Sequence, residues 1–245
     1  MHLLTCLLSF SVFGLGVPLE FFDSSAGQSS KEGKVRWIGA MMKVKGLGDL
    51  KGYADLGKFR NHPHLYAVGP VEGLQGEVTI FDGKPFIAKM HGKKAKVHTK
   101  SYPKACFLVY AQVKRWNKTV IPDSVKSKTD LEAFILMAAE RQRLSPKEPF
   151  VFLVKGTAKR VNYHIIHWTG KGKFGHEQHE KAKVQLRFQD KPVKIVGFHS
   201  DHHQGVFTCM GNFHMHVITQ DNKHSGHMDD LQLGSGCRLF LPARR

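Results

Sequence analysis

Seven segments rich in β-branched and aromatic residues follow one another after Pro149, and they constrain the fold of this chain more than any other feature. Each has the length and composition of a strand, and the connections are short apart from a loose stretch at 170–173. A succession of strands with few helices predicts an α+β protein dominated by antiparallel sheet. The expected strands span 150–155, 160–167, 184–188, 193–198, 213–219, 227–233 and 238–241.

A hairpin is expected in the first half of the chain. Strand-like residues 77–81 and 84–88 flank Asp82 and Gly83, a pair that suits the positive φ angles of a type I′ turn. Another apolar run at 106–113 predicts a further strand. With 245 residues the chain can bury a sizeable core, and we expect one domain over 35–245, built of two lobes with a boundary near 148.

A capped helix is expected after Ser127. The Ser127 side chain can accept a hydrogen bond from the first-turn amides, Asp130 follows three residues later, and Pro146 forbids continuation of the helix. One face of this helix would be apolar and would carry Leu131, Phe134, Ile135 and Ala138.

The first 16 residues form an apolar run that is too short to span a bilayer comfortably and that precedes small residues. This pattern predicts a secretory signal peptide at 1–16; a buried strand or helix is the alternative, because the run carries no Lys or Arg. Residues 17–34 should form a flexible N-terminus.

Because no later segment has the apolar length of a membrane helix, we expect a secreted protein without a membrane partner. Asn117 begins a glycosylation pattern that matters only on a eukaryotic secretory route.

Three cysteines would remain after removal of that leader, Cys106, Cys209 and Cys237. This odd number allows at most one internal disulfide, or three thiols. No Cys-x-x-Cys pattern occurs, so a thiolate zinc ribbon or a thioredoxin-type site is not supported. We expect at least one buried, unpaired thiol.

The charge balance points to an anionic partner, because 37 Lys and Arg oppose 20 Asp and Glu for a net charge of +17. Between 84 and 128 the sequence has 12 Lys and Arg and a single acid, Asp123. Such a cluster suits a sulfated glycan or another polyanion, and a solvated basic face is the simpler alternative. Tyr102 and Trp116 are too few for a stacking platform, so no specific nucleic acid is expected. The densest stretch contains Lys93, Lys94, Lys96, Lys100 and Lys104.

A histidine pattern near the C-terminal end predicts a metal site. His214 and His216 are two apart in an expected strand, so both imidazoles point to one face. If 220–223 form the following turn, His216 stands directly opposite His227. Three neutral imidazoles suit zinc (Zn²⁺), and three protein ligands leave room for water or substrate, as in catalytic zinc sites.

Two other histidine-rich stretches are expected to form solvated surface. One is 199–203, in an expected loop, which could also support the zinc ligands through hydrogen bonds. The other is 176–180, whose helical spacing lacks apolar support.

These motifs resemble the α-acetolactate decarboxylase family. The stretch from Gly197 to Leu231, with Phe-His-Met-His-Val-Ile and then Ser-Gly-His-Met-Asp-Asp, is similar to the zinc-binding stretch of that family. Residues 69–84, Gly-Pro-Val-Glu-Gly-Leu-Gln-Gly-Glu-Val-Thr-Ile-Phe-Asp-Gly-Lys, are similar to its Gly-Glu strand before an Asp-Gly turn. The resemblance covers roughly 35–242 and implies a two-lobed α+β fold with zinc between the lobes. It also implies a carboxy-lyase that converts 2-acetolactate to acetoin and carbon dioxide.

The resemblance assigns zinc to His214, His216 and His227, and it makes Glu77 the carboxylate near the metal. The family's active-site arginine is replaced by His164, and Arg160 could substitute because strand alternation places it on the same face. The family's second glutamate, beyond a Leu-Pro motif, has no counterpart in this sequence. We therefore expect a divergent lyase of reduced activity. Separately, we expect it to be a homo-oligomer. The alternatives are a secreted zinc-binding pseudoenzyme that binds polyanions or matrix, and a zinc enzyme with another substrate.

Overall fold

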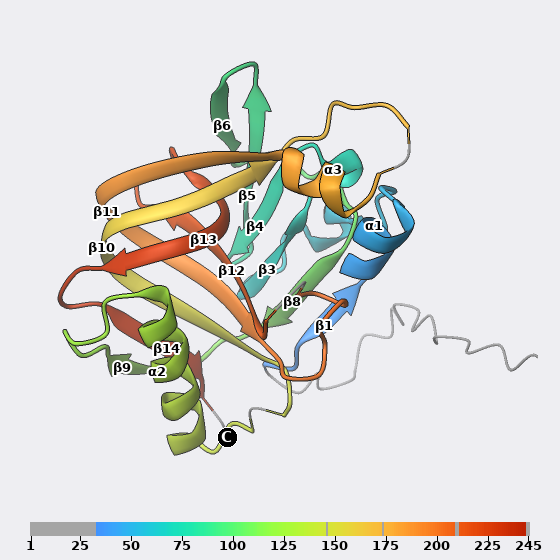
Figure 1. Ribbon diagram of the computed structural model, residues 1–245. Helices are drawn as coiled ribbons and strands as arrows, with labels where there is room; N and C mark the ends of the chain where they lie inside the picture. Colours follow the sequence, from blue (N-terminus) through green and yellow to red (C-terminus); the bar gives the residue numbers. More distant parts are fainter. Residues whose placement is uncertain (1–32, 146, 173, 209–210, 244–245) are drawn as a thin grey trace, which may run out of the picture. The chain divides into compact units, whose positions relative to one another are not determined.

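Two antiparallel six-stranded sheets divide most of the strands between them in the computed structural model (Figure 1). The structure describes residues 33–145, 147–172, 174–208 and 211–243, so the expected signal peptide and Cys209 lie outside the described residues. The described ranges contain three α-helices, α1 (Met41–Leu47), α2 (Lys128–Arg141) and α3 (His176–Lys181). The predicted α+β class, mostly antiparallel with few helices, is confirmed.

The first sheet has the strand order β1-β8-β3-β4-β5-β6. Its strands are β1 (Arg36–Ile38), β3 (Leu65–Pro70), β4 (Glu77–Phe81), β5 (Lys84–His91), β6 (Lys94–His98) and β8 (Leu108–Gln112). The predicted hairpin is confirmed as β4 and β5, because Asp82 and Gly83 between them have φ angles of 51° and 76°. A two-residue pair, β2 (Ala54–Asp55) with β7 (Lys104–Ala105), lies outside both large sheets.

The second sheet has the order β11-β12-β13-β10-β14-β9. Its strands are β9 (Trp116–Val120), β10 (Phe150–Ile166), β11 (Lys183–His199), β12 (Phe213–Thr219), β13 (Ser225–Leu233) and β14 (Arg238–Pro242). The chain thus passes from one sheet to the other between β8 and β9, and the lobe boundary near 148 stays a prediction.

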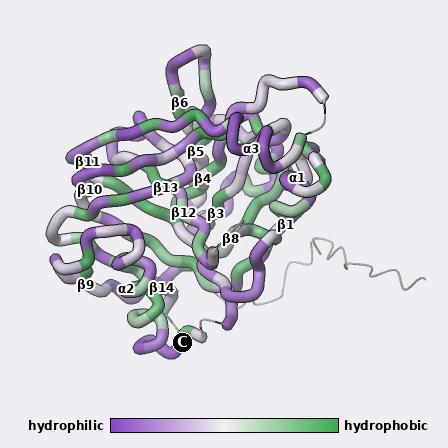
Figure 2. Tube along the Cα trace, in the orientation of Figure 1, coloured by the Kyte–Doolittle hydropathy of each residue, from purple (hydrophilic) through white to green (hydrophobic). Residues whose placement is uncertain are grey.

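The strands β10 and β11 are each one continuous 17-residue strand, which corrects the expectation of two shorter strands in each place. Their antiparallel pairing runs from Phe150 and His199 to Ile166 and Lys183. The ladder toward β13 shifts register between Ala158 and Arg160, so the turn-like residues there form an irregularity within a strand. Figure 2 shows hydrophobic and hydrophilic residues alternating along much of these long strands, whereas α3 is hydrophilic.

Four strands of the second sheet close on themselves, because β10 pairs with β11 along one edge and with β13 along the other. The core inside this ring includes Met215 and Val217 of β12. Successive side chains of a strand point to opposite faces, so His214 and His216 face away from this core. Ile218, on their face, packs in a cluster with Val68 of β3 and Val109 of β8. The two histidines therefore face the first sheet.

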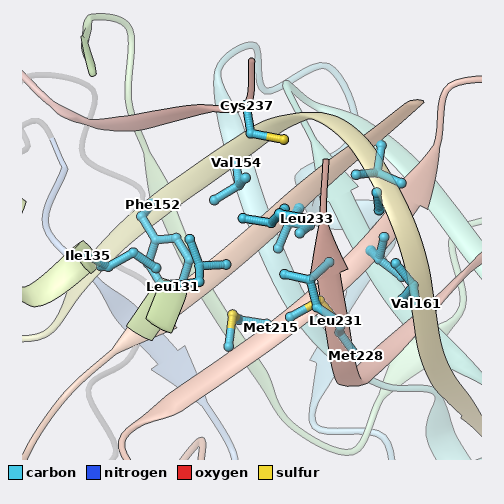
Figure 3. Close-up of a cluster of buried hydrophobic side chains, with 14 of the residues drawn as sticks. Leu131, Ile135, Phe152, Val154, Val161, Met215, Met228, Leu231, Leu233 and Cys237 are labelled. Atoms are coloured by element: carbon cyan, nitrogen blue, oxygen red, sulfur yellow. The ribbon is translucent and has the colours of Figure 1, made fainter. Parts of the chain in front are cut away.

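The helix α2 begins and packs as the sequence predicts. The Ser127 hydroxyl accepts from the Asp130 N–H and the Asp130 carboxylate accepts from the Ser127 N–H, which completes a capping box. Figure 3 shows Leu131 and Ile135 of α2 beside Phe152 of β10 in one buried cluster. Within the described residues no helix is both long and apolar enough to cross a membrane.

Candidate metal centre and cavity

The hairpin of β12 and β13 brings three histidines together. His216 is the direct partner of His227, and Ile218 is the partner of Ser225. The Thr219 N–H donates to the His224 carbonyl at 3.0 Å, so 220–223 form the loop. The predicted register is confirmed, and it places one imidazole from each strand side by side.

The side-chain nitrogens of His214, His216 and His227 lie within 4.8 Å of one another, as required of a group that could hold a metal ion. Nε2 of His214 and Nε2 of His216 are 3.2 Å apart. Burial lowers the pKa of His214 to about 4 and holds those of His216 and His227 well below their usual value. These imidazoles are therefore neutral, and a neutral imidazole is the form that binds zinc.

The first sheet orients one of these imidazoles. The Thr79 hydroxyl of β4 lies 3.0 Å from Nδ1 of His216 and 3.3 Å from the Ser225 hydroxyl. All three side chains are buried. With Nδ1 held by Thr79, Nε2 of His216 is the nitrogen that points toward the other two histidines, and such outer contacts commonly fix metal ligands. The site therefore lies where the two sheets meet.

Glu77 reaches the same place from the start of β4. Its side chain is 4% exposed, its Oε2 lies 3.7 Å from Nε2 of His216, and its Oε1 accepts from the Ile166 N–H at 3.2 Å. Burial raises the pKa of Glu77 well above its usual value, against the opposing effect of the Ile166 hydrogen bond. Glu77 can thus carry a proton at a pH at which an exposed glutamate has lost it.

His164 and Arg160 lie in different surroundings in the structure. His164 of β10 is the direct partner of His227, and their ring centroids are 4.7 Å apart. Its Nδ1 donates to Oδ1 of Asp229 at 2.7 Å, where β13 shifts register. Arg160 instead donates to Asp230 at 2.9 Å and is not among the described residues that line the cavity. The structure therefore brings His164, but not Arg160, to the histidine cluster.

A cavity of about 150 Å³ lies against these residues, which is space for a small molecule. Glu77, His164, His214, His227 and Asp229 line its polar side. Met41 and Val44 of α1 and Phe107, just before β8, line an apolar part. Three lysines also line the cavity: Lys45, Lys128 and Lys183.

Several of these residues were missed from the sequence. His179 of α3 is buried and lines the cavity, and His199 is fully buried at the end of β11. His176 and His202 are exposed, whereas the expectation that 176–180 and 199–203 form solvated surface was wrong for His179 and His199. Helical or strand periodicity gave no signal, because contacts from elements distant in sequence bury these side chains. Cys106 and Cys237 are buried free thiols, as expected for at least one cysteine.

Fold and site together define a class of two-sheet α+β protein with a buried three-histidine centre between the sheets. The chain belongs to the alpha-acetolactate decarboxylase family, whose model matches residues 47–240. It is a divergent member, because it is 25% identical over 170 residues to the alpha-acetolactate decarboxylase of Bacillus licheniformis. That match covers 69% of this chain and 63% of the relative, which is less than two thirds of the relative's length.

Solved structures show the same fold. The alpha-acetolactate decarboxylase of Bacillus subtilis strain 168 matches with a TM-score of 0.71 and 16% identity, over 86% of each chain. The acetolactate decarboxylase of Bacillus subtilis subspecies spizizenii matches with a TM-score of 0.73 and 17% identity, over 86% of this chain and 87% of the other. The resemblance found in the sequence is confirmed at the level of family and fold.

Proposed function

We propose that this protein is a zinc-dependent carbon–carbon lyase that decarboxylates 2-acetolactate to acetoin. The observation that carries the proposal is the position of Glu77, whose buried carboxyl group lies 3.7 Å from His216 and lines the cavity. A buried carboxyl group with a raised pKa, beside three neutral imidazoles, provides a proton donor next to a group that could hold a metal ion. Family membership supports the choice of substrate.

The reaction breaks the bond between the carboxylate carbon and C2 of the substrate. Carbon dioxide leaves, the electron pair of that bond stays on the remaining fragment, and a proton must then reach C2 to give acetoin. Zinc held by His214, His216 and His227 would supply a Lewis acid for the negative charge that develops on the substrate oxygens. Glu77 is the proton donor in this proposal, because it lines the cavity and burial raises its pKa, which favours the protonated form.

His164 lies on the cavity wall and contacts the substrate in this proposal. Asp229 occupies its Nδ1, so Nε2 is the atom available to a ligand. One imidazole gives a carboxylate at most a single hydrogen bond, whereas an arginine gives a charged bidentate pair. We therefore expect His164 to bind the carboxylate of acetolactate less strongly than an arginine at this position would.

The test is direct. Purified protein is incubated with racemic acetolactate, and acetoin is measured before and after treatment with a chelator, with zinc added back. We expect acetoin formation that the chelator abolishes and zinc restores. A protein that binds zinc stoichiometrically but forms no acetoin at any pH would instead support the pseudoenzyme alternative.

A second proposal concerns the projecting β5–β6 hairpin and the loop after it (Figure 1). Four lysines are exposed there: Lys93, Lys94, Lys96 and Lys100. None of them takes part in an ion pair among the described residues. We propose that the N-terminal leader directs export of this protein, and that this surface then binds sulfated glycans. Replacing Lys93, Lys94 and Lys96 by Gln should reduce retention on heparin and its salt dependence without changing zinc content. Unchanged elution would contradict this proposal.

A further inference from the structure

Cationic side chains at the cavity suggest how an anionic substrate is held. Lys45, Lys128 and Lys183 all line it, from α1, α2 and β11. We propose that the ammonium group of Lys183 binds the carboxylate of the substrate, in place of the active-site arginine that His164 replaces. This inference rests on the proposed function, because it takes the substrate to be a small hydroxy acid.

The register of β10 and β11 places Lys183 close to Glu77. Lys183 is the direct strand partner of Ile166, and the Ile166 N–H donates to Glu77 at 3.2 Å. The charge of Lys183 acts on the carboxyl group of Glu77, and it opposes the rise in the pKa of Glu77 that burial causes. A carboxylate bound to Lys183 would therefore lie at the Glu77 end of the cavity, beside the proposed proton donor.

Glu180 of α3 fixes the position of Lys183. Its Oε2 accepts from Nζ of Lys183 at 2.5 Å, and its Oε1 lies 3.8 Å from Nζ of Lys45. Glu180 itself is exposed and does not line the cavity. An ammonium group has three donors, so a single bond to Glu180 leaves Lys183 able to bind a second carboxylate from the cavity side. Because this lysine is already ordered, binding costs less side-chain entropy.

Lys128 is the competing candidate, and the geometry favours Lys183. The Lys128 side chain is 33% exposed against 20% for Lys183, and its partner Glu132 lies 3.7 Å away. A better buried ammonium group in a fixed position interacts more strongly with an anion, because water screens it less. Lys45 is buried further, at 10% exposed, but its Nζ lies 3.8 Å from Glu180 against 2.5 Å for Lys183, and of the three lysines it is Lys183 whose charge acts on Glu77.

The carboxylate loses its charge as it departs as carbon dioxide, which gives Lys183 a kinetic signature. An ammonium group that holds the carboxylate stabilises the bound substrate more than the transition state. Lys183→Gln should therefore raise KM for acetolactate about tenfold or more, with kcat unchanged or higher. A merely structural role would lower kcat.

Binding of two unreactive probes to the zinc-loaded protein separates this inference from the proposed activity. By calorimetry, Lys183→Gln should weaken 2-hydroxyisobutyrate, which has a carboxylate, about tenfold or more, and should leave acetoin, which has none, unchanged within about twofold. Lys183→Arg should retain most of the affinity. Lys181→Gln is the matched control, because Lys181 is 69% exposed, pairs with Glu177 and lies outside the cavity lining.

Three results would overturn the inference: no binding of 2-hydroxyisobutyrate to the wild type, equal affinity in Lys183→Gln, or a loss in Lys128→Gln or Lys45→Gln that Lys183→Gln does not show. A protein that binds the probe through Lys183 but forms no acetoin would contradict the proposed function and keep this inference. If the wild type forms acetoin and Lys183→Gln has the same KM, the proposed function is kept and this inference is contradicted.

Discussion

Thr79 and His216 are joined by a hydrogen bond of 3.0 Å between the Thr79 hydroxyl and Nδ1 of the imidazole, across 137 residues of sequence. One residue belongs to the first sheet and the other to the second. The first sheet therefore orients a proposed metal ligand of the second sheet, and the packing of the sheets and the geometry of the site depend on each other.

Thr79→Val should weaken zinc binding by about ten- to a hundredfold, because it removes the group that holds Nδ1 of His216 while keeping the shape of the side chain. Competition with a chromophoric chelator measures this change. Thr99→Val, at an exposed position, is the control and should bind zinc as the wild type does. Equal affinity in both variants would show that the hydrogen bond does not support the site.

His216→Asn should abolish stoichiometric zinc, because a site of three imidazoles loses one of its ligands. Elemental analysis of the purified variant gives the metal content. The matched control is His202→Asn, at an exposed histidine outside the cluster, which should keep one equivalent. One equivalent of zinc in the His216 variant would mean that the ligands are other residues.

His179 should make the protein less stable in acid. Burial lowers its pKa to about 4, whereas a histidine in the unfolded chain titrates near 6.5. Between these values the unfolded state binds the additional proton, so stability falls as the pH falls from 6.5 to 4. His179→Gln should reduce this loss by at most about 3 kcal/mol. Urea unfolding at several pH values tests this, with exposed His176→Gln as the control; parallel curves for wild type and His179→Gln would contradict it.

Leu131→Ala should destabilise the protein by about 2–5 kcal/mol, because Leu131 is fully buried between α2 and the second sheet and its loss leaves a cavity. Met137→Ala on the exposed face of the same helix should cost about 0.5 kcal/mol or less. Denaturant unfolding compares the two variants. Similar losses would show that α2 does not pack through Leu131.

Local patterns were sufficient to predict part of the site. The register of His216 and His227 depends on a four-residue loop between adjacent strands, and the cap of α2 depends on Ser127 and Asp130 alone. Both are fixed by contacts close in sequence, so both could be predicted.

The remaining site residues depend on contacts between distant elements. Thr79 is an ordinary strand residue until β4 meets β12, and His179 is buried because its helix packs beside α1 and β11. Alternation placed Arg160 and His164 on one face, but only His164 reaches the cluster, because Asp230 holds Arg160. The continuous strands β10 and β11 were divided in the prediction, since their middle residues resemble turns locally. The register of β10 shifts there, and Asp190 of β11 has a φ of 47°.

Glu77→Gln tests the central claim most directly, because it keeps the shape of the side chain and removes the proton that the reaction needs. The variant and the wild type are loaded with zinc, their metal content is measured, and acetoin formation from acetolactate is compared. We predict an unchanged zinc content and a loss of about 10²- to 10⁴-fold in kcat. Equal turnover in the two proteins at equal zinc content would contradict the assignment of Glu77 as proton donor.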